Sequence, residues 1–162
     1  MNQVLEPKTE LPRGSVVLPA YNEEGALGGV LDAVNALRDR YDLDVIVVEG
    51  GSKDRTVRVA QEHGATRIIS SPVKRGKGAD FWTGVLAATG DYIVQIDTDH
   101  QFEPSEIPRM VDALAAGADM AIATRFVKQA RLEAESVRPL NMFGNWVFSW
   151  LTTLLTGQRI TD

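Results

Sequence analysis

Short apolar runs alternate with helical patterns along most of the chain. Several of these runs are almost continuously apolar, which is typical of strands buried on both faces of a sheet. The predicted strands, in chain order, cover residues 15–19, 44–48, 66–70, 92–96 and 119–124. Apolar residues between them recur at helical spacing, and the predicted helices cover 27–40, 55–63, 81–88 and 104–116. Gly64 and Gly90 stand where the second and third of these helices are expected to end.

This alternation predicts an α/β fold with a mostly parallel sheet and helices on both of its faces. Ligands bind such sheets at the carboxyl ends of the strands. Polar residues follow four of the predicted strands at these ends, namely Tyr21 to Glu23, Glu49 to Ser52, Asp97 to Asp99, and Thr124 with Arg125. We therefore expect these side chains to share one rim of the sheet.

Asp97 and Asp99 follow a predicted strand and are separated by one residue. Because side chains alternate along an extended chain, both carboxylates would point to one side, and Gln101 would continue the series. Oxygen donors of this kind suit Mg²⁺ or Mn²⁺, which usually keep substrate phosphates in their remaining positions. The alternative is an ordinary turn after a strand, because aspartate is common in turns that hold no metal.

Length and composition indicate a folded domain and exclude some functions. The chain has 162 residues, of which 44% are hydrophobic, so one domain is expected, with residues 1–13 as a flexible lead-in and 14–162 as the domain. A net charge of −5 argues against a general nucleic-acid-binding surface, and the lack of cysteine excludes disulfides and thiolate metal sites. The lead-in lacks the apolar core of a signal peptide, and no apolar stretch is long enough to span a bilayer, so we expect a cytoplasmic protein.

A basic, glycine-containing segment covers residues 72–79. Lys74, Arg75 and Lys77 supply charge that suits phosphate, and the glycines allow close approach of the backbone to a ligand. The spacing matches neither a Walker loop nor a dinucleotide-binding fingerprint. Taken alone, this segment also fits a solvated basic turn.

Five segments together resemble the inverting family 2 glycosyltransferases in order and spacing. The likeness is greatest to the polyprenyl-phosphate hexosyltransferases, which include the dolichol-phosphate mannose synthases. It extends from about residue 15 to the end of the chain. The segments that carry it are residues 17–24 (VLPAYNEE), 51–56 (GSKDRT), 75–78 (RGKG), 90–91 (GD) and 97–101 (DTDHQ).

The resemblance implies an A-type nucleotide-diphospho-sugar fold with a DXD motif that holds Mg²⁺ or Mn²⁺ on the donor diphosphate. By matched position, Glu49 would stand near the base or ribose, and Arg125 would approach the diphosphate or the acceptor phosphate. The nucleotide-binding residues would be Pro19, Tyr21, Glu23, Glu49, Lys77 and Asp97, and the metal would meet Asp97, Asp99 and Gln101. The residues expected to serve catalysis are Asp99, Arg125 and Asp162, the last as a candidate general base.

The chain departs from the family pattern in two places. The family usually has two aspartates before Gly-Ser, where this chain has Glu49 and Gly50. Family members also generally continue beyond the equivalent of residues 158–162, often with membrane helices. We therefore expect this sequence to be truncated within the catalytic domain.

The resemblance implies transfer of a hexose from a nucleotide donor to a polyprenyl phosphate, by direct displacement with inversion. A phosphate acceptor is already ionised and needs orientation by cations rather than a general base. Arg125, Lys128, Arg131 and Arg138 form a cationic series that fits this role, although such a series also fits a solvated face. The alternatives are a sugar hydroxyl acceptor, a catalytically incompetent nucleotide-sugar-binding fragment and, less in keeping with Gln101, a metal-dependent phosphatase.

Residues 141–155 form a predicted amphipathic helix. Its apolar stripe combines two rows at helical spacing, which contain Met142, Trp146, Trp150 and Leu154, and Phe143, Val147, Leu151 and Leu155. At 1.5 Å per residue the stripe reaches only about 21 Å, short of the roughly 30 Å hydrocarbon core. We expect this helix to lie in the inner face of the membrane beside the acceptor site, or to cover its stripe in a homo-oligomer. Packing on the domain's own sheet is the alternative.

Overall fold

The structure is a computed structural model that describes residues 12–98, 104–123, 148–155 and 157. It divides the chain into two compact units, residues 1–108 and 109–162. Each unit is described by itself below. A single catalytic domain over residues 14–162 stays a prediction.

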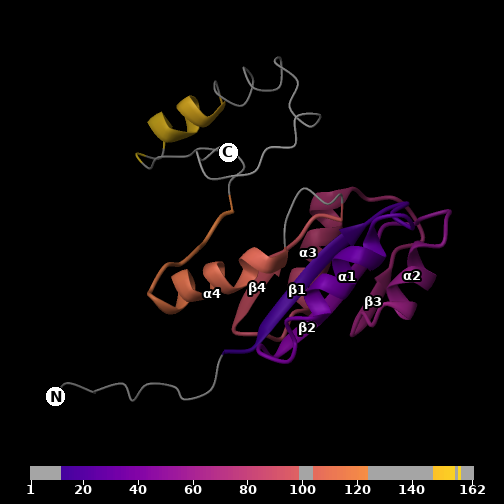
Figure 1. The fold of residues 1–162 in the computed structure, drawn as a ribbon. Helices are drawn as coiled ribbons and strands as arrows, with labels where there is room; N and C mark the ends of the chain where they lie inside the picture. Colours follow the sequence, from indigo (N-terminus) through magenta and orange to yellow (C-terminus); the bar gives the residue numbers. More distant parts are fainter. Residues whose placement is uncertain (1–11, 99–103, 124–147, 156, 158–162) are drawn as a thin grey trace. The chain divides into compact units, whose positions relative to one another are not determined.

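The first unit is built on a parallel sheet of four strands in the order β3-β2-β1-β4 (Figure 1). The two central strands, β1 (Gly14–Ala20) and β2 (Leu43–Glu49), are buried along their whole length. The outer strands, β3 (Arg67–Ser70) and β4 (Tyr92–Gln95), are shorter and partly exposed. The parallel pairing of all four strands confirms the predicted parallel α/β fold. The continuously apolar runs of the sequence are its two central strands.

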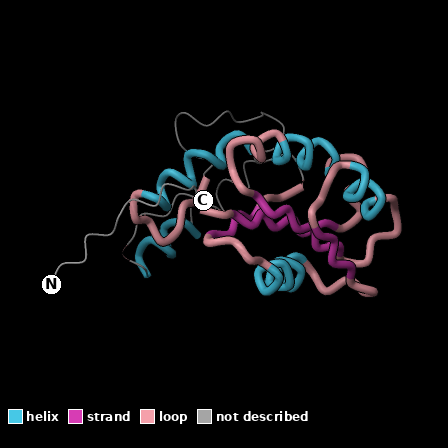
Figure 2. The backbone as a smooth tube through the Cα atoms, turned by 90° about the horizontal axis from the view of Figure 1, so that it is seen from below, coloured by secondary structure: helices cyan, strands magenta, loops and turns pink. Residues whose placement is uncertain are grey.

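Helices cover both faces of this sheet (Figure 2). They are α1 (Leu27–Asn35), α2 (Thr56–Glu62) and α3 (Lys77–Ala87). Val17, Ile46 and Val48 form a buried cluster against which Phe81 of α3 packs. The contact is close, since a Cβ added at Gly84 of α3 would lie 2.3 Å from Cγ1 of Val17. Leu18, the residue after Val17 in β1, points to the opposite face of the sheet, because side chains alternate along a strand.

The helix bounds differ from the prediction in physically interpretable ways. The first helix ends at Asn35, and residues 36–40 form turns instead of continuing to 40. The third begins at Lys77, four residues before the predicted start at 81, because Gly76 with φ 93° turns the chain into the helix there. Gly64 has φ 73° and ends the second helix as predicted.

The expectation that Gly90 ends the third helix is wrong. That helix ends at Ala87, and Ala88 is already extended with ψ 142°. Gly90 is instead needed for close approach to β1, because a Cβ there would lie 2.7 Å from the backbone nitrogen of Ser15. Its backbone N–H donates to the Ser15 hydroxyl at 2.9 Å.

The predicted helix at 104–116 begins as a 3₁₀ turn, η1 (Pro104–Glu106), followed by α4 (Ile107–Ala115). The strand predicted at 119–124 is wrong for residues 119–123, which form no strand. Met120 and Ile122 are there 73% and 64% exposed. A strand requires a paired neighbour, and apolar composition alone does not supply one.

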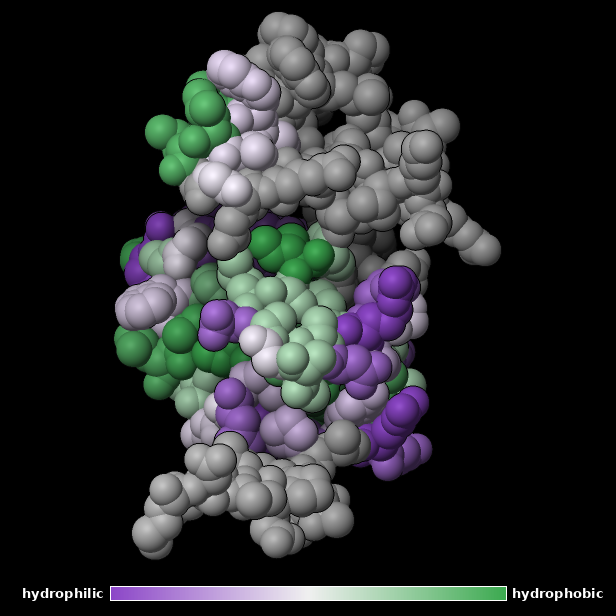
Figure 3. Space-filling model, turned by 90° about the vertical axis from the view of Figure 1, so that its left-hand side faces the viewer, coloured by the Kyte–Doolittle hydropathy of each residue, from purple (hydrophilic) through white to green (hydrophobic). Residues whose placement is uncertain are grey.

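Residues 148–155 are helical, in agreement with that part of the predicted helix at 141–155, whereas 141–147 lie outside the described residues. The large apolar side chains of this described helix are exposed, and they are Phe148, Trp150, Leu151, Leu154 and Leu155. Hydrophobic side chains at the surface are visible in the space-filling view (Figure 3). Within the described ranges, no helix combines the length and apolar character needed to cross a membrane.

Candidate functional site

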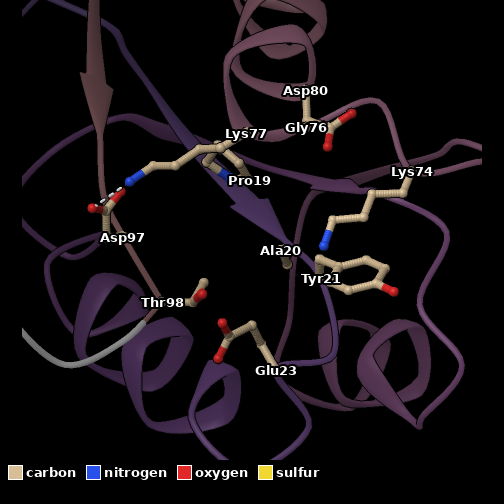
Figure 4. Close-up of a pocket in the computed structure, with 10 residues that line it drawn as sticks. All are labelled: Pro19, Ala20, Tyr21, Glu23, Lys74, Gly76, Lys77, Asp80, Asp97 and Thr98. Atoms are coloured by element: carbon tan, nitrogen blue, oxygen red, sulfur yellow. Dashed lines mark hydrogen bonds and ion pairs between the residues drawn. The ribbon is translucent and has the colours of Figure 1, made fainter.

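A pocket of about 290 Å³ opens in the first unit at the carboxyl ends of β1 and β4. The chain order of the sheet reverses between these two strands, and ligands of open α/β sheets bind at such points. Its volume is near the lower end of the roughly 300–1,000 Å³ of typical ligand pockets. The lining residues (Figure 4) are Pro19, Ala20, Tyr21, Glu23, Lys74, Gly76, Lys77, Asp80, Asp97 and Thr98.

One side of the pocket carries an ion pair between α3 and the segment after β4. The Nζ atom of Lys77 lies 2.6 Å from Oδ2 of Asp97, and both side chains remain partly exposed (Figure 4). The other oxygen, Oδ1 of Asp97, is buried and has no hydrogen-bond partner among the described residues. A buried carboxylate oxygen without a partner is costly, and a cation would satisfy it.

The opposite side of the pocket is aromatic and basic. The ammonium of Lys74 lies 3.9 Å from the centre of the Tyr21 ring, which is within cation–π range (Figure 4). Glu23 and Thr98 line the pocket between these two sides. The pocket therefore offers separate cationic groups, an aromatic face and carboxylates, which is a suitable set for a ligand with an aromatic ring and a polyanionic end.

The loops that follow β1 and β2 are tied to each other by hydrogen bonds. We call this set, residues 22–24 with 52–56, the loop clamp. The backbone N–H of Asn22 donates to the Ser52 hydroxyl at 2.9 Å, and the Asn22 side-chain oxygen accepts from the Lys53 N–H at 2.9 Å. The Glu23 N–H donates to the Thr56 hydroxyl at 2.8 Å. Asn22 adopts φ 57°, a conformation that asparagine tolerates better than most residues.

Two carboxylates of the loop clamp are held in their charged form. Glu24 accepts hydrogen bonds from the backbone and side chain of Arg55, and these bonds lower the pKa of its carboxyl group. Burial would raise the pKa of Asp54, but hydrogen bonds from Thr56 and from the Glu24 N–H outweigh it and lower that pKa. The acidic residues of these loops thus hold the rim of the pocket in place.

Glu49, expected near the base or ribose, is only 4% exposed. Its carboxylate accepts a hydrogen bond from the backbone N–H of Ser52, inside the turn that leaves β2. It is not among the side chains that line the described pocket. Its assignment to the nucleotide stays a prediction.

The structure brings five of the predicted nucleotide-binding residues into one pocket, and they are Pro19, Tyr21, Glu23, Lys77 and Asp97. The other predicted site residues, Asp99, Gln101, Arg125 and Asp162, lie outside the described residues. Within the described ranges, no group of three or more His, Cys, Asp or Glu side chains is placed to hold a metal ion. Asp97 is thus the described member of the predicted metal-binding set.

The sequence did not single out one further pocket residue, Asp80, and it placed Thr98 at the expected rim without giving it a role. Asp80 is 3% exposed and paired with Arg75, whose Nη2 lies 3.3 Å from Oδ1. The available signal was Gly50, where the family pattern has an aspartate. A missing carboxylate at the end of β2 could have prompted a search for another one nearby.

Comparison with known proteins gives a family and several relatives. The profile described as "Glycosyl transferase family 2" matches residues 15–152. A dolichol-phosphate mannosyltransferase of Pyrococcus furiosus is 31% identical over 122 residues, which cover 74% of this chain and 35% of that protein. A dolichyl-phosphate hexose transferase of Haloferax volcanii is 32% identical over 148 residues, which cover 91% of this chain and 61% of that protein.

A solved structure gives the same fold. It is glucosyl-3-phosphoglycerate synthase from Mycobacterium tuberculosis, in complex with Mn²⁺, UDP-glucose and phosphoglyceric acid. The TM-score is 0.58 and the identity 37%, and the match covers 65% of this chain and 40% of that one. This chain therefore spans less than two thirds of the length of each of these relatives.

Proposed function

Because the chain belongs to glycosyl transferase family 2 and has its A-type α/β fold, we propose that it forms the donor-binding part of an enzyme that transfers a hexose from a nucleoside diphosphate to a polyprenyl phosphate. The observation that carries this proposal is the pocket itself. It combines the aromatic ring of Tyr21 with the Lys77–Asp97 pair. These groups match the base and the diphosphate ends of a nucleotide-sugar donor.

The donor diphosphate requires cationic partners on this chain. Lys77 can move from Asp97 to a phosphate oxygen, because its side chain is more than half exposed and its stem is flexible. Asp97 would then be free to bind Mg²⁺ or Mn²⁺ together with Asp99 and Gln101 of the DXD motif. The Oδ1 atom of Asp97 is buried and has no hydrogen-bond partner within the described part of the chain, and its oxygen chemistry fits such a hard cation.

The bond that breaks joins the anomeric carbon to the diphosphate, and the bond that forms joins that carbon to an acceptor oxygen from the opposite side, with inversion. A bound metal would stabilise the charge that develops on the leaving nucleoside diphosphate. Lys77 would contribute a second fixed charge to the same oxygens. An ionised phosphate acceptor needs no general base, and Arg125 is our candidate to orient it.

The acceptor in this proposal is a polyprenyl phosphate. The names of two relatives described above identify them as sugar transferases that use dolichol phosphate. The exposed apolar side chains of residues 148–155 supply a surface that a membrane interface could cover, and we propose peripheral association with the inner face of the membrane.

A second candidate acceptor is a small phosphorylated molecule with a free hydroxyl. The likeness to a structure that contains phosphoglyceric acid favours it. A hydroxyl acceptor needs a general base, for which Asp162 is our candidate. A nucleotide-sugar-binding module without catalysis is the third possibility for this length of chain.

Calorimetry with UDP and with GDP, in the presence and absence of Mn²⁺, tests the donor site. We expect Mn²⁺ to strengthen binding by the wild type, and Asp97→Ala and Asp99→Ala each to remove this enhancement. Asp39→Ala removes an exposed carboxylate elsewhere in the same unit and serves as the control. An unchanged Mn²⁺ dependence in both Asp97→Ala and Asp99→Ala would contradict the metal assignment.

Transfer assays then identify the acceptor class. Labelled nucleotide sugars would be offered with a polyprenyl phosphate in detergent or with 3-phosphoglycerate, to this chain and to a version extended beyond residue 162. Product with the polyprenyl phosphate supports the main proposal, and product with 3-phosphoglycerate supports the second. Donor binding without transfer by either chain would favour the binding module.

A further inference from the structure

Asp80 is a buried carboxylate at the wall of the pocket. It lies in the first turn of α3 and is 3% exposed, yet it lines the cavity. Burial of a charged group requires a partner, and Arg75 supplies it with Nη2 3.3 Å from Oδ1. The same Nη2 lies 3.1 Å from the Thr83 hydroxyl, so the guanidinium is anchored at two points.

The second oxygen of Asp80 lies against the end of β2. A Cβ added at Gly50 would be 2.7 Å from Oδ2 of Asp80, which is closer than such atoms can approach. The carboxylate therefore occupies the space in which a side chain of residue 50 would begin. The family pattern usually has an aspartate at the position of Gly50, and this chain instead brings a carboxylate to the same place from α3.

The pocket has two ends with different chemistry. Lys77 and Asp97 form the end that suits a diphosphate and a metal. Tyr21, Lys74 and Asp80 lie away from that pair (Figure 4). The Tyr21 ring and the Asp80 carboxylate line the same pocket. Such a pair suits a nucleobase, because the ring can stack while the carboxylate accepts a hydrogen bond from the polar edge of the base.

We infer that Asp80, oriented by Arg75 and accommodated by Gly50, is the residue that reads the donor's base. This inference rests on the proposed function, since it assigns a role within the same donor site. A carboxylate only accepts hydrogen bonds, so Asp80 would accept one from a ring N–H of the base. Uracil and guanine carry such an N–H, whereas cytosine and adenine present a bare ring nitrogen at that point.

The test measures the binding of UDP, GDP, CDP and free pyrophosphate, all with Mn²⁺, by calorimetry. We expect the wild type to prefer UDP or GDP over CDP. Asp80→Asn removes the charge and replaces one of the two accepting oxygens by a donating NH₂ group, and we expect it to weaken binding of the preferred nucleotide by roughly tenfold to a hundredfold. Binding of pyrophosphate should change less than twofold, because the diphosphate end is untouched. Asp39→Asn makes the same change at an exposed site and should alter neither ligand.

A second variant moves the carboxylate back to the end of β2. Gly50→Asp alone should lose nucleotide affinity, because its Cβ collides with Asp80. In Gly50→Asp/Asp80→Ala the collision is gone, and the φ of residue 50 is outside the left-handed region, so a side chain can be placed there. We expect this double variant to bind the preferred nucleotide more tightly than Asp80→Ala by about tenfold. It decides the question even if Asp80→Asn fails to fold.

The outcomes separate this inference from the proposed function. If the wild type binds UDP or GDP and Asp80→Asn binds it equally well, the inference is wrong and the donor site stands. An equal loss of pyrophosphate and nucleotide in Asp80→Asn, with no rescue by the double variant, would also overturn it. A wild type that binds no nucleoside diphosphate would reject the proposed function and the inference with it.

Discussion

The ammonium of Lys77 and the carboxylate of Asp97 meet at 2.6 Å on one side of the pocket. Lys77 belongs to the first turn of α3, and Asp97 follows β4, so the pair joins two segments that are twenty residues apart in the chain. The ion pair places a positive charge on Oδ2 of Asp97, directly beside the Oδ1 atom that we propose as a metal ligand. In our proposal, metal and ammonium therefore compete for the Asp97 carboxylate until a diphosphate gives the ammonium another partner.

This competition predicts opposite effects of Lys77→Ala on two ligands. Mn²⁺ alone should bind equally well or more tightly, because a like charge beside the metal has been removed. UDP or GDP with Mn²⁺ should bind about tenfold to a hundredfold more weakly, because a charge-assisted hydrogen bond to phosphate is lost. Electron paramagnetic resonance of free Mn²⁺ measures the first effect, and calorimetry measures the second.

Lys53→Ala is the control for this experiment, since Lys53 also carries an ammonium near the rim but does not line the pocket. It should leave both affinities close to those of the wild type. Parallel losses of Mn²⁺ and nucleotide binding in Lys77→Ala would mean that Lys77 supports the site structurally and does not exchange partners.

Acid should weaken the loop clamp. The pKa values of Glu24 and Asp54 are lowered in the folded chain, so the unfolded chain binds more protons as the pH falls. Their contribution to stability is present above their ordinary pKa values of about 4 and is lost as the pH falls through the lower folded-state values. We expect Asp54→Asn to reduce the free energy of unfolding by about 1 kcal/mol or less at pH 7.

The difference between wild type and Asp54→Asn should shrink as the pH falls below about 4, because the wild-type carboxyl group is then protonated as well. Urea unfolding followed by circular dichroism at several pH values measures it. Asp39→Asn, at an exposed position, should show no such pH dependence. A difference that stays constant down to pH 2 would show that the charge of Asp54 contributes nothing.

Two glycines of α3 should respond oppositely to alanine. A Cβ at Gly84 would meet Cγ1 of Val17 at 2.3 Å and Cγ2 of Val48 at 3.1 Å, so Gly84→Ala should destabilise the fold by about 1–3 kcal/mol through overpacking. A Cβ at Gly78 meets nothing within 4 Å, so Gly78→Ala should be neutral or stabilising by up to about 1 kcal/mol. Urea unfolding of both variants measures the difference. Equal changes would contradict the close packing of α3 on β1.

The helix at 148–155 should bind membranes through its exposed apolar residues. Trp150 is 57% exposed and Leu154 is 67% exposed. Trp150→Ser/Leu154→Ser removes about 3 kcal/mol or more of apolar burial in a bilayer interface. We expect the wild type to float with liposomes of anionic lipid, and the double variant to bind them at least about tenfold more weakly.

Trp82→Ser is the matched control, because Trp82 is a tryptophan of similar exposure, 60%, in another helix. It should float like the wild type. Failure of the wild type to float, or an equal loss in Trp82→Ser, would reject this helix as the membrane-binding element. Concentration-dependent dimerisation without flotation would instead support self-association through the same residues.

The sequence predicted the central strands well because Val16 to Leu18 and Val45 to Val48 must be buried on both faces. It placed the start of α3 too late, since two glycines at positions 76 and 78 look like a loop until the turn at Gly76 is seen to begin the helix. For Met120 and Ile122, the sequence predicted a strand, but these residues form none. Their apolar pattern suits a strand, but pairing depends on a neighbour that a local pattern cannot identify.

The candidate site was predictable where a residue follows a strand directly. Tyr21, Glu23 and Asp97 reach the pocket because the carboxyl ends of β1 and β4 lie side by side. Asp80 could not be found in this way, because its role depends on the space left by Gly50, thirty residues earlier. Spatial complementarity of this kind leaves a trace in the sequence only as an unexpected glycine.

The loop clamp has a consequence for the speed of ligand binding. Asn22 and Ser52 belong to loops of different strands, but their hydrogen bonds fix both loops before any ligand arrives. When the loops of a binding site are flexible, a ligand binds only those protein molecules whose loops are correctly arranged. The apparent affinity then equals the intrinsic affinity multiplied by the fraction of such molecules. Because the two loops are held together, we expect that fraction to be larger than it would be for two untied loops. Each collision of correct orientation with the rim can then lead directly to a bound complex, without waiting for a slower rearrangement of these loops.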